Sequence, residues 1–158
     1  MILPAHIAFE SPDQPEVHGL IRELDAYLYA LYPPECVYAM DIASLLQPAV
    51  HFAVIRDAGG TALGCGAVVI KPDYAEIKRV YVAPSMRGHG LARALVAALE
   101  AKAVAQGRRD IMLETGPTQV EACILYERLG YQVRGPFGDY PPDPHSLFMH
   151  KRAAVACV

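Results

Sequence analysis

The chain has 158 residues, of which 53% are hydrophobic, and its formal net charge is −3 at pH 7. This length allows one domain with a substantial core, so we expect a single domain over residues 1–158. The negative charge and the lack of a basic cluster argue against a nucleic-acid partner, and the apolar runs are too short to cross a bilayer.

The first half of the chain predicts two helices and a hairpin. Apolar residues recur at helical spacing over residues 17–31, between two proline-containing segments, which predicts an amphipathic helix. A shorter helix is expected at residues 42–46. Residues 50–55 and 61–70 have the composition of strands and are separated by a turn segment, AspAlaGlyGly, so we expect them to form a hairpin.

The middle of the chain predicts a strand, a long helix and a second strand. Residues 76–82 have a composition typical of a strand and form the first of these elements. A helix with one apolar side follows, which begins at Leu91 and ends at Gly107. Residues 111–114 should form a buried strand parallel to the first. Because such a crossover is right-handed, the turn after the first strand lies at its carboxyl end, where these sheets bind ligands.

The last part of the chain predicts a helix and two strands. The helix should end at Gly130, and Thr118 and Glu121 should form a capping box at its start. Residues 131–134 and 146–151 have the composition of strands. A proline-rich loop joins them.

Residues 77–92, IKRVYVAPSMRGHGLA, carry the clearest functional signal. They indicate a strand that breaks at Pro84 into a glycine-containing turn, followed by a helix. Backbone N–H groups at a helix start lack internal partners, the helix dipole adds positive charge there, and glycine lets phosphate oxygens approach the main chain. The segment therefore predicts a diphosphate-binding turn, although it has neither the Walker pattern nor the GxGxxG of dinucleotide folds.

Two motifs resemble the GNAT superfamily of N-acetyltransferases. Arg87, Gly90 and Ala92 match the RxxGxA form of that family's phosphate turn. Residues 119–127, QVEACILYE, resemble its NxxAxxLY helix, with Gln in place of the usual Asn. The resemblance extends over about residues 61–151.

This resemblance implies an α/β (α+β) fold of the GNAT type. We expect a central mixed, twisted sheet of about six to seven strands, flanked by about four helices. The segments TyrProProGlu and PheGlyAspTyr also resemble a bacterial subgroup of the superfamily whose substrates are mostly unassigned.

The resemblance also implies acetyl-CoA as the co-substrate. Main-chain groups of Val80, Tyr81 and Val82 would pair with the strand-like pantetheine arm, and a backbone N–H near Val82 would stabilise the tetrahedral oxyanion. Gln119 would take over the contact that the family's Asn makes with the pantetheine region. The diphosphate would be held by the main chain of the turn, which comprises Arg87, Gly88, His89, Gly90, Leu91 and Ala92.

Transfer to an amine requires a base, because an amine with a pKa near ~10.4 is almost entirely protonated at neutral pH. Glu114, at the end of the second parallel strand, is the first candidate. Its interval to Tyr126 equals the one between base and acid in the alanine acetyltransferases of ribosomal proteins, which this segment resembles. Glu76 is the rival, because several family members place the base on that strand. Either carboxylate could instead form a structural ion pair with Lys78 or Arg79.

Tyr126 is the candidate acid. The resemblance makes it the proton donor to the coenzyme A thiolate, and a phenol can supply a proton while its ring packs. Spacing alone would favour a core aromatic residue, whereas the match to the whole motif favours the acid. Cys123, one turn earlier, is more typical of a small buried hydrophobe than of a nucleophile. We therefore expect direct transfer in a ternary complex.

The histidines and cysteines do not predict a metal site. No histidine pair has HxxxH spacing with a carboxylate partner. Cys36, Cys65, Cys123 and Cys157 are widely separated, so we expect free thiols. The N-terminus lacks the basic and apolar segments of a secretion signal. Together these features predict a metal-free cytoplasmic protein without a membrane partner.

The acceptor is expected to be a primary amine of a small molecule. In the superfamily the first helices and the last loop form the substrate wall, which would here include Tyr32, Glu35, Phe137 and Tyr140. This mixture of aromatic rings and acids suits a small cationic amine. Arg79 could pair with a carboxylate on the acceptor.

Two other functions remain open. The chain could be a non-catalytic acyl-CoA-binding sensor, or it could acetylate an N-terminal or lysine amine of a protein. The presence of both Tyr126 and Glu114 favours an enzyme, because a sensor needs neither an acid nor a base. The long loop after Gly135 favours a small molecule, because it would close a peptide groove. Dimers are frequent in the superfamily, so a homodimer is a further expectation.

Overall fold

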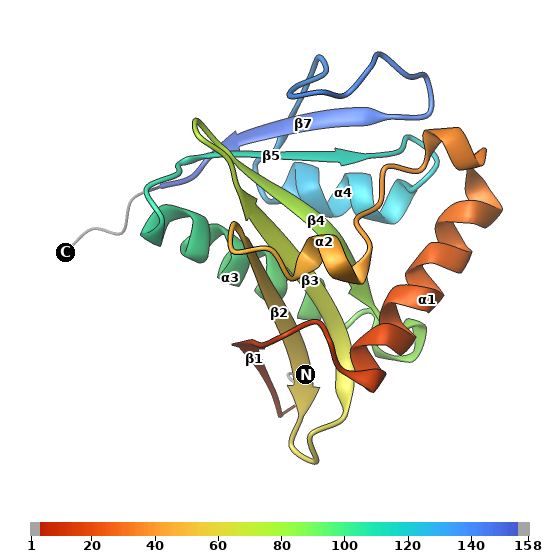
Figure 1. The fold of residues 1–158 in the computed structure, drawn as a ribbon, viewed down its shortest axis with the longest axis vertical. Helices are drawn as coiled ribbons and strands as arrows, with labels where there is room; N and C mark the ends of the chain where they lie inside the picture. The colour runs from red at the N-terminus through yellow and green to blue at the C-terminus, as the bar shows by residue number, and fades with distance from the viewer. Residues whose placement is uncertain (1–3, 155–158) are drawn as a thin grey trace.

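The structure, a computed structural model, describes residues 4–154 of the chain (Figure 1). The helices and strands expected from residue 17 onward are all present. In chain order the elements are β1 (Ala5–Phe9), α1 (Pro15–Leu31), the 3-10 helix η1 (Pro34–Cys36), α2 (Ile42–Leu45), β2 (Val50–Asp57), β3 (Ala62–Ile70), β4 (Ala75–Val82), the 3-10 helix η2 (Pro84–Met86), α3 (Leu91–Ala105), β5 (Asp110–Thr115), α4 (Val120–Arg128), β6 (Gln132–Arg134) and β7 (Leu147–Arg152).

One mixed sheet of seven strands organises residues 4–154, in the order β1-β2-β3-β4-β5-β7-β6. β4 and β5 are parallel, and the other neighbouring pairs are antiparallel. α3 makes the crossover between the two parallel strands. The predicted mixed α/β sheet with flanking helices is therefore confirmed.

Helices cover both faces of the sheet (Figure 1). Val17, Leu20, Ile21 and Leu24 of α1 pack on one face together with Leu45 of α2. The other face packs against α3 and α4. β3 is buried along most of its length, which explains its nearly continuous apolar sequence. The sheet thus forms the middle layer, and the core lies on both of its sides.

β4 and β5 diverge after their first residues, as Figure 1 shows. Their paired register runs from Ala75 opposite Ile111 to Ile77 opposite Leu113. β4 continues from there to Val82, and the glycine-containing turn and α3 follow. The carboxyl ends of the two parallel strands therefore separate at the point where the sequence predicts the ligand.

Two local features differ from the expectation. β1 pairs with β2 at the edge of the sheet and was not expected, because its five residues give too short a pattern. The prediction of a capping box formed by Thr118 and Glu121 is wrong. α4 begins after Gln119 without a side-chain cap, and the Thr118 hydroxyl instead donates a hydrogen bond to the Tyr32 hydroxyl, 2.8 Å away.

The sequence predicts no membrane-spanning segment and four free thiols, and the structure tests both predictions only for the residues that it describes. Within residues 4–154, no helix combines the length and apolar character needed to cross a membrane. Cys36, Cys65 and Cys123 are free thiols, as expected. Cys157 lies outside the described residues.

Candidate active site

A cleft of about 870 Å³ is lined by α1, β4, the start of α3, the end of β5 and α4. Among the predicted site residues, those that line it are Tyr32, Arg79, Val80, Tyr81, Val82, Arg87, Gly88, Gly90, Leu91, Ala92, Glu114, Gln119 and Tyr126. Those that do not line it are Glu35, Glu76, His89, Phe137 and Tyr140. The structure thus gathers most predicted cofactor and catalytic residues around one space and leaves out part of the predicted substrate wall.

β4 presents a free main-chain edge to this cleft. Its other edge is paired with β3, up to Val82 opposite Gly64. On the cleft side, no strand of the described residues pairs with β4 beyond Ile77. Main-chain groups of residues 80–82 are therefore able to hydrogen-bond to an extended ligand that contains amides, as an added strand does.

The glycine-containing turn leads directly into α3. Gly88 and Gly90 have φ angles of +83° and +76°, which residues with a side chain rarely adopt. Gly90 is the N-cap of α3, so the unpaired N–H groups of the first helical turn border the cleft. The Arg87 guanidinium folds back, donates to the Val82 carbonyl at 3.2 Å and lies 5.7 Å from the ring centroid of Tyr81. The main-chain N–H groups of this turn are therefore able to bind an anion.

Two cofactor candidates occupy different positions. Gln119 lines the cleft, and its side-chain amide donates a hydrogen bond to the Tyr32 hydroxyl at 3.2 Å. His89 belongs to the turn but lines a separate cavity of about 300 Å³, together with Ile7 of β1 and Ile55 of β2.

Tyr126 reaches the cleft from α4. Its ring is buried and contacts Tyr131 edge-on, with 5.6 Å between the ring centroids. Burial raises the pKa of Tyr126 well above its ordinary value. The residue lines the cleft. Tyr126 is thus a protonated phenol whose hydrogen is available to a ligand.

Glu114 carries the perturbed carboxyl group of the cleft. Burial raises its pKa to about 7. The Ser146 hydroxyl donates a hydrogen bond to Glu114 Oε2 at 2.9 Å, which favours the ionised form and opposes this rise. A carboxyl group with a pKa near neutrality suits a general base.

Glu76 is buried, does not line the cleft and belongs to a partly buried polar cluster. The Tyr140 hydroxyl donates to its Oε2 at 2.5 Å, and Lys78 Nζ lies 3.5 Å from the same oxygen. Lys78 also donates to the Tyr140 hydroxyl at 2.6 Å and to the Tyr38 carbonyl at 2.9 Å. The ion pair with Lys78, which the sequence left open, therefore forms at Glu76. Of the two candidate bases, Glu114 is the one that lines the cleft.

Arg79 occupies an irregular position of β4 and is almost fully buried. Its φ is +59°, and the β3–β4 register shifts opposite this point. Its Nη2 donates to Asp25 Oδ1 of α1 at 2.6 Å. Nε and Nη1 are buried and have no hydrogen-bond partner among the described residues. Because Arg79 lines the cleft, a ligand that accepts these hydrogen bonds would relieve an unfavourable burial.

Tyr32 forms the part of the predicted substrate wall that reaches the cleft. Its hydroxyl accepts hydrogen bonds from Thr118 and Gln119. This placement requires glycine at Gly116, because a Cβ there would overlap with the Tyr32 ring. Tyr32, the C-cap of α1, is thus hydrogen-bonded to the two residues that precede α4.

The other predicted wall residues lie outside the cleft lining. Glu35 is exposed on η1. Phe137 and Tyr140 pack against Phe148 of β7, with centroid distances of 5.8 and 5.4 Å. Tyr140 is hydrogen-bonded to Lys78, which itself lines the cleft.

Three further residues belong to the site, although the sequence did not predict them there. Cys36 and His145 line the cleft, and Ser146 contacts Glu114. The β5–β7 register, with Glu114 opposite Phe148, is what brings Ser146 next to the carboxylate. No local motif marks these positions, so only a correct strand pairing could have identified Ser146.

Comparison with known proteins assigns the family. The Acetyltransferase (GNAT) family matches residues 17–131 of the chain. An IAA acetyltransferase of Azospirillum brasilense is 46% identical over 147 residues, which cover 92% of this chain and 95% of that protein. A Klebsiella pneumoniae protein described as an acyl-CoA N-acyltransferase superposes with a TM-score of 0.81 at 39% identity, over 95% of this chain and 98% of that one.

A more distant structure shares the fold. The PaiA N-acetyltransferase of Thermoplasma acidophilum, solved in complex with coenzyme A, gives a TM-score of 0.72 at 18% identity, over 94% of this chain and 98% of that one. The free strand edge, the glycine-containing turn and the buried tyrosine thus occur in a chain whose sequence and fold match one family. The chain belongs to the Acetyltransferase (GNAT) family and is an acyltransferase.

Proposed function

We propose that this chain transfers the acetyl group of acetyl-CoA directly to a primary amine of a small molecule in a ternary complex. The observation that carries the proposal is that groups with opposite proton-transfer roles line one cleft. Glu114, with a pKa raised to about 7, is able to accept a proton. Tyr126, whose pKa is raised by burial, keeps its proton and is able to donate it.

Acetyl-CoA would bind mainly to the main chain. In this proposal the N–H groups of residues 87–92 hold the diphosphate, and the free edge of β4 at residues 80–82 pairs with the pantetheine arm. A main-chain N–H near Val82 would then donate to the thioester oxygen. An oxyanion donor of this kind contributes about 3–4 kcal/mol to transition-state stabilisation.

The reaction begins when Glu114 removes a proton from the ammonium form of the acceptor. The free amine attacks the thioester carbon, and negative charge develops on the former carbonyl oxygen next to the N–H near Val82. When the C–S bond breaks, the sulfur leaves as a thiolate and takes the phenol proton of Tyr126. The second nitrogen proton goes to solvent as the amide forms. Glu114 then releases its proton to solvent, and solvent reprotonates the Tyr126 oxygen.

We assign the base to Glu114 rather than to Glu76. Glu114 lines the cleft, whereas Glu76 is engaged by Tyr140 and Lys78. A carboxylate that is already paired with a cation is a weaker proton acceptor than one whose pKa burial has raised.

We call the part of the cleft that is lined by Tyr32, Tyr38, Arg79 and Glu114 its acceptor end. It favours a small amine that also carries an anionic group. Tyr32 and Tyr38 add aromatic surface to this part of the cleft. A carboxylate on the acceptor would accept hydrogen bonds from the unpartnered Nε and Nη1 of Arg79. Leaving such a buried donor unpaired costs about 1–3 kcal/mol. Glu114 would meet the amine of the same molecule.

The test measures the release of the coenzyme A thiol from acetyl-CoA with a panel of possible acceptors. The panel contains amino acids, polyamines, aromatic amines, short peptides and IAA, the compound named for the Azospirillum brasilense relative. Calorimetry with acetyl-CoA and coenzyme A measures binding in parallel. Turnover with a small amine is expected. Binding without turnover over the whole panel would identify a sensor, and turnover with peptides alone would identify a protein acetyltransferase.

A further inference from the structure

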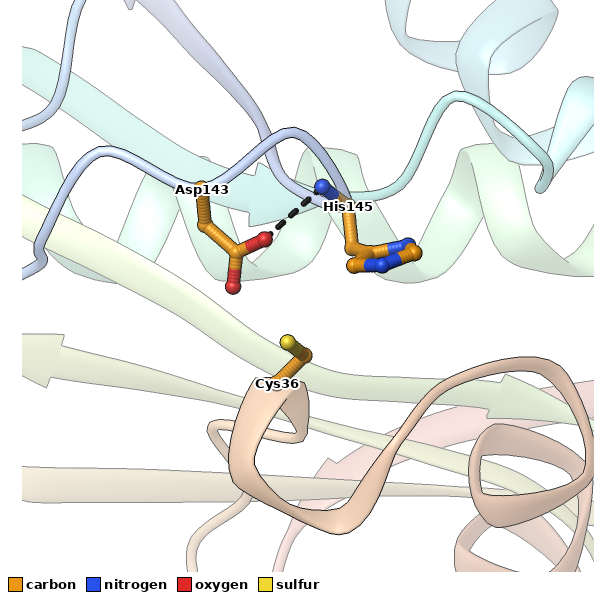
Figure 2. A group of neighbouring side chains, drawn as sticks. All are labelled: Cys36, Asp143 and His145. Atoms are coloured by element: carbon orange, nitrogen blue, oxygen red, sulfur yellow. Dashed lines mark hydrogen bonds between the residues drawn. The ribbon is translucent and has the colours of Figure 1, made fainter.

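Three side chains of different chemistry meet at the acceptor end of the cleft. The thiol of Cys36, a carboxylate oxygen of Asp143 and a ring nitrogen of His145 all lie within 4.8 Å of one another. Figure 2 shows Cys36 on η1 facing the loop that carries Asp143 and His145 before β7. The group therefore joins two segments that are far apart in the sequence.

Backbone and side-chain contacts hold Asp143 in place. Its Oδ1 accepts a hydrogen bond from the main-chain N–H of His145 at 2.8 Å, and its Oδ2 accepts one from the Tyr38 hydroxyl at 2.7 Å. The main-chain N–H of Ser146 donates to the Asp143 carbonyl at 3.0 Å. Each carboxylate oxygen has a second lone pair, so Asp143 is able to accept a further partner.

The two loops are also stiff. Cys36 follows two prolines at the start of η1, and Pro144 separates Asp143 from His145. Proline restricts the backbone and lowers the entropy lost when the ligands are ordered. The His145 ring packs edge-on against Tyr32, with 6.0 Å between the centroids. The three donor groups are thus already close together and oriented by their surroundings.

We propose that Cys36, Asp143 and His145 form a binding site for Zn²⁺. A thiolate, an imidazole and a carboxylate are the ligands that this cation takes at tetrahedral sites, whereas Mg²⁺ and Ca²⁺ prefer oxygen atoms alone. Three protein ligands leave the fourth position open. On binding, Zn²⁺ forms a bond to the Cys36 sulfur, and the S–H proton is released to solvent.

The location gives the ion a regulatory consequence. Cys36 and His145 line the cleft next to Tyr32 and Tyr38. An ion there would tie η1 to the loop before β7, and it would lie at the border of the space that the acceptor would use. Zn²⁺ should therefore inhibit acetyl transfer by competing with the acceptor and not with acetyl-CoA. This consequence rests on the proposed function, whereas the site itself does not.

Binding is tested with tag-free protein in a buffer with a phosphine reductant, so that neither a histidine tag nor a dithiol competes for the ion. Calorimetry with Zn²⁺ gives the affinity and the stoichiometry. Co²⁺ in place of Zn²⁺ reports the ligands, because a thiolate ligand produces a sulfur-to-cobalt charge-transfer band. Cys36→Ser and His145→Ala each remove one ligand. Cys123→Ser and His6→Ala change the same residue types away from the group and serve as matched controls.

The expected result is one Zn²⁺ per chain, with the affinity lowered by more than about 10-fold in Cys36→Ser and in His145→Ala and unchanged in both controls. Tyr38→Phe, which removes only the hydrogen bond to Asp143, should weaken binding to a smaller extent. Absence of heat with the wild-type chain, or equal affinity in Cys36→Ser, would overturn the proposal, as would a Co²⁺ complex without the charge-transfer band. These measurements need no acceptor, so their outcome is independent of whether the chain acetylates amines.

Discussion

The two ends of the cleft are built by different means. In the proposed function, the cofactor end would use main-chain groups of one contiguous segment, residues 80–92. The acceptor end would use side chains from α1, η1, β4, β5 and the loop before β7. A site made of main-chain groups follows from a strand, a turn and a helix, which local sequence patterns encode. A site made of side chains depends on how distant segments pack. Substitutions at the first end should therefore change coenzyme A binding, and those at the second should change turnover.

Glu114→Gln should have the largest effect on turnover. It removes the group that accepts the amine proton and keeps the size and hydrogen-bonding capacity of the side chain. We expect kcat to fall by about 10²–10⁴-fold, while the coenzyme A affinity measured by calorimetry stays the same. A parallel loss of coenzyme A binding would contradict the division between the two ends.

Glu76→Gln is the matched comparison. It leaves the partly buried Lys78 without its counter-charge, since Lys78 Nζ lies 3.5 Å from Glu76 Oε2. The free energy of unfolding, measured by chemical denaturation, should fall by about 1–3 kcal/mol. Turnover should decrease less than in Glu114→Gln. A stable Glu76→Gln protein without turnover would move the base to Glu76.

Tyr126→Phe should lower kcat by about 10²-fold, because the thiolate leaves without a proton donor. Coenzyme A affinity should not change. Tyr131→Phe tests specificity, since Tyr131 contacts the same ring but donates its hydrogen bond to Glu100 at 2.6 Å. That variant should lose about 1 kcal/mol of stability and retain its turnover. Similar kinetics in the two variants would show that the Tyr126 hydroxyl does not act as the acid.

Gly90→Val should act at the cofactor end. Gly90 has a φ of +76°, and a Cβ there would meet nothing within 4 Å, so the cost arises from backbone strain and from obstruction of the phosphate. Coenzyme A affinity should fall by more than about 10-fold, or 1.4 kcal/mol. Gly107→Val carries the same strain, with a φ of +79° and open space, at the far end of α3. It should lower stability and leave coenzyme A binding intact.

The smallest expected effect is a shift in the pH profile. Only the ionised form of Glu114 accepts a proton, so kcat should rise with pH through the pKa of Glu114, which is about 7. Ser146 donates a hydrogen bond that lowers this pKa. Ser146→Ala should therefore move the rise in kcat to higher pH. The same acceptor is used for both proteins, so its own ionisation cancels. A shift to lower pH would exclude Glu114 as the titrating group.

The sequence predicted the elements of residues 80–92 well because their signals are local. The strand, the glycine-containing turn and the helix that holds Leu91 occur where the pattern of apolar residues and glycines indicates. The capping box was predicted wrongly because the partner of Thr118 is distant in the sequence. Thr118 has the right spacing to Glu121, but its hydroxyl bonds to Tyr32, which is 86 residues away. No local pattern contains that contact.

The acceptor end was predicted only in part for the same reason. The sequence identified Glu114 and Glu76 as candidate bases but could not choose between them, since the choice depends on burial and on the contacts of Lys78 and Tyr140. Cys36 and His145 became neighbours only through the packing of η1 against the loop before β7. Spacing rules for metal ligands find sites within one motif and miss a site assembled from two loops.

The one-sided pairing of β4 has a consequence for the handling of the protein. Exposed strand edges recruit strands from other molecules and so promote aggregation. The free edge of β4 borders a cleft that residues of α1 and α4 also line. In the proposed function, the pantetheine arm of acetyl-CoA would occupy this edge in place of a strand from another molecule. Heating should be better tolerated by protein saturated with coenzyme A, since the cofactor would act as a guest strand that completes the sheet.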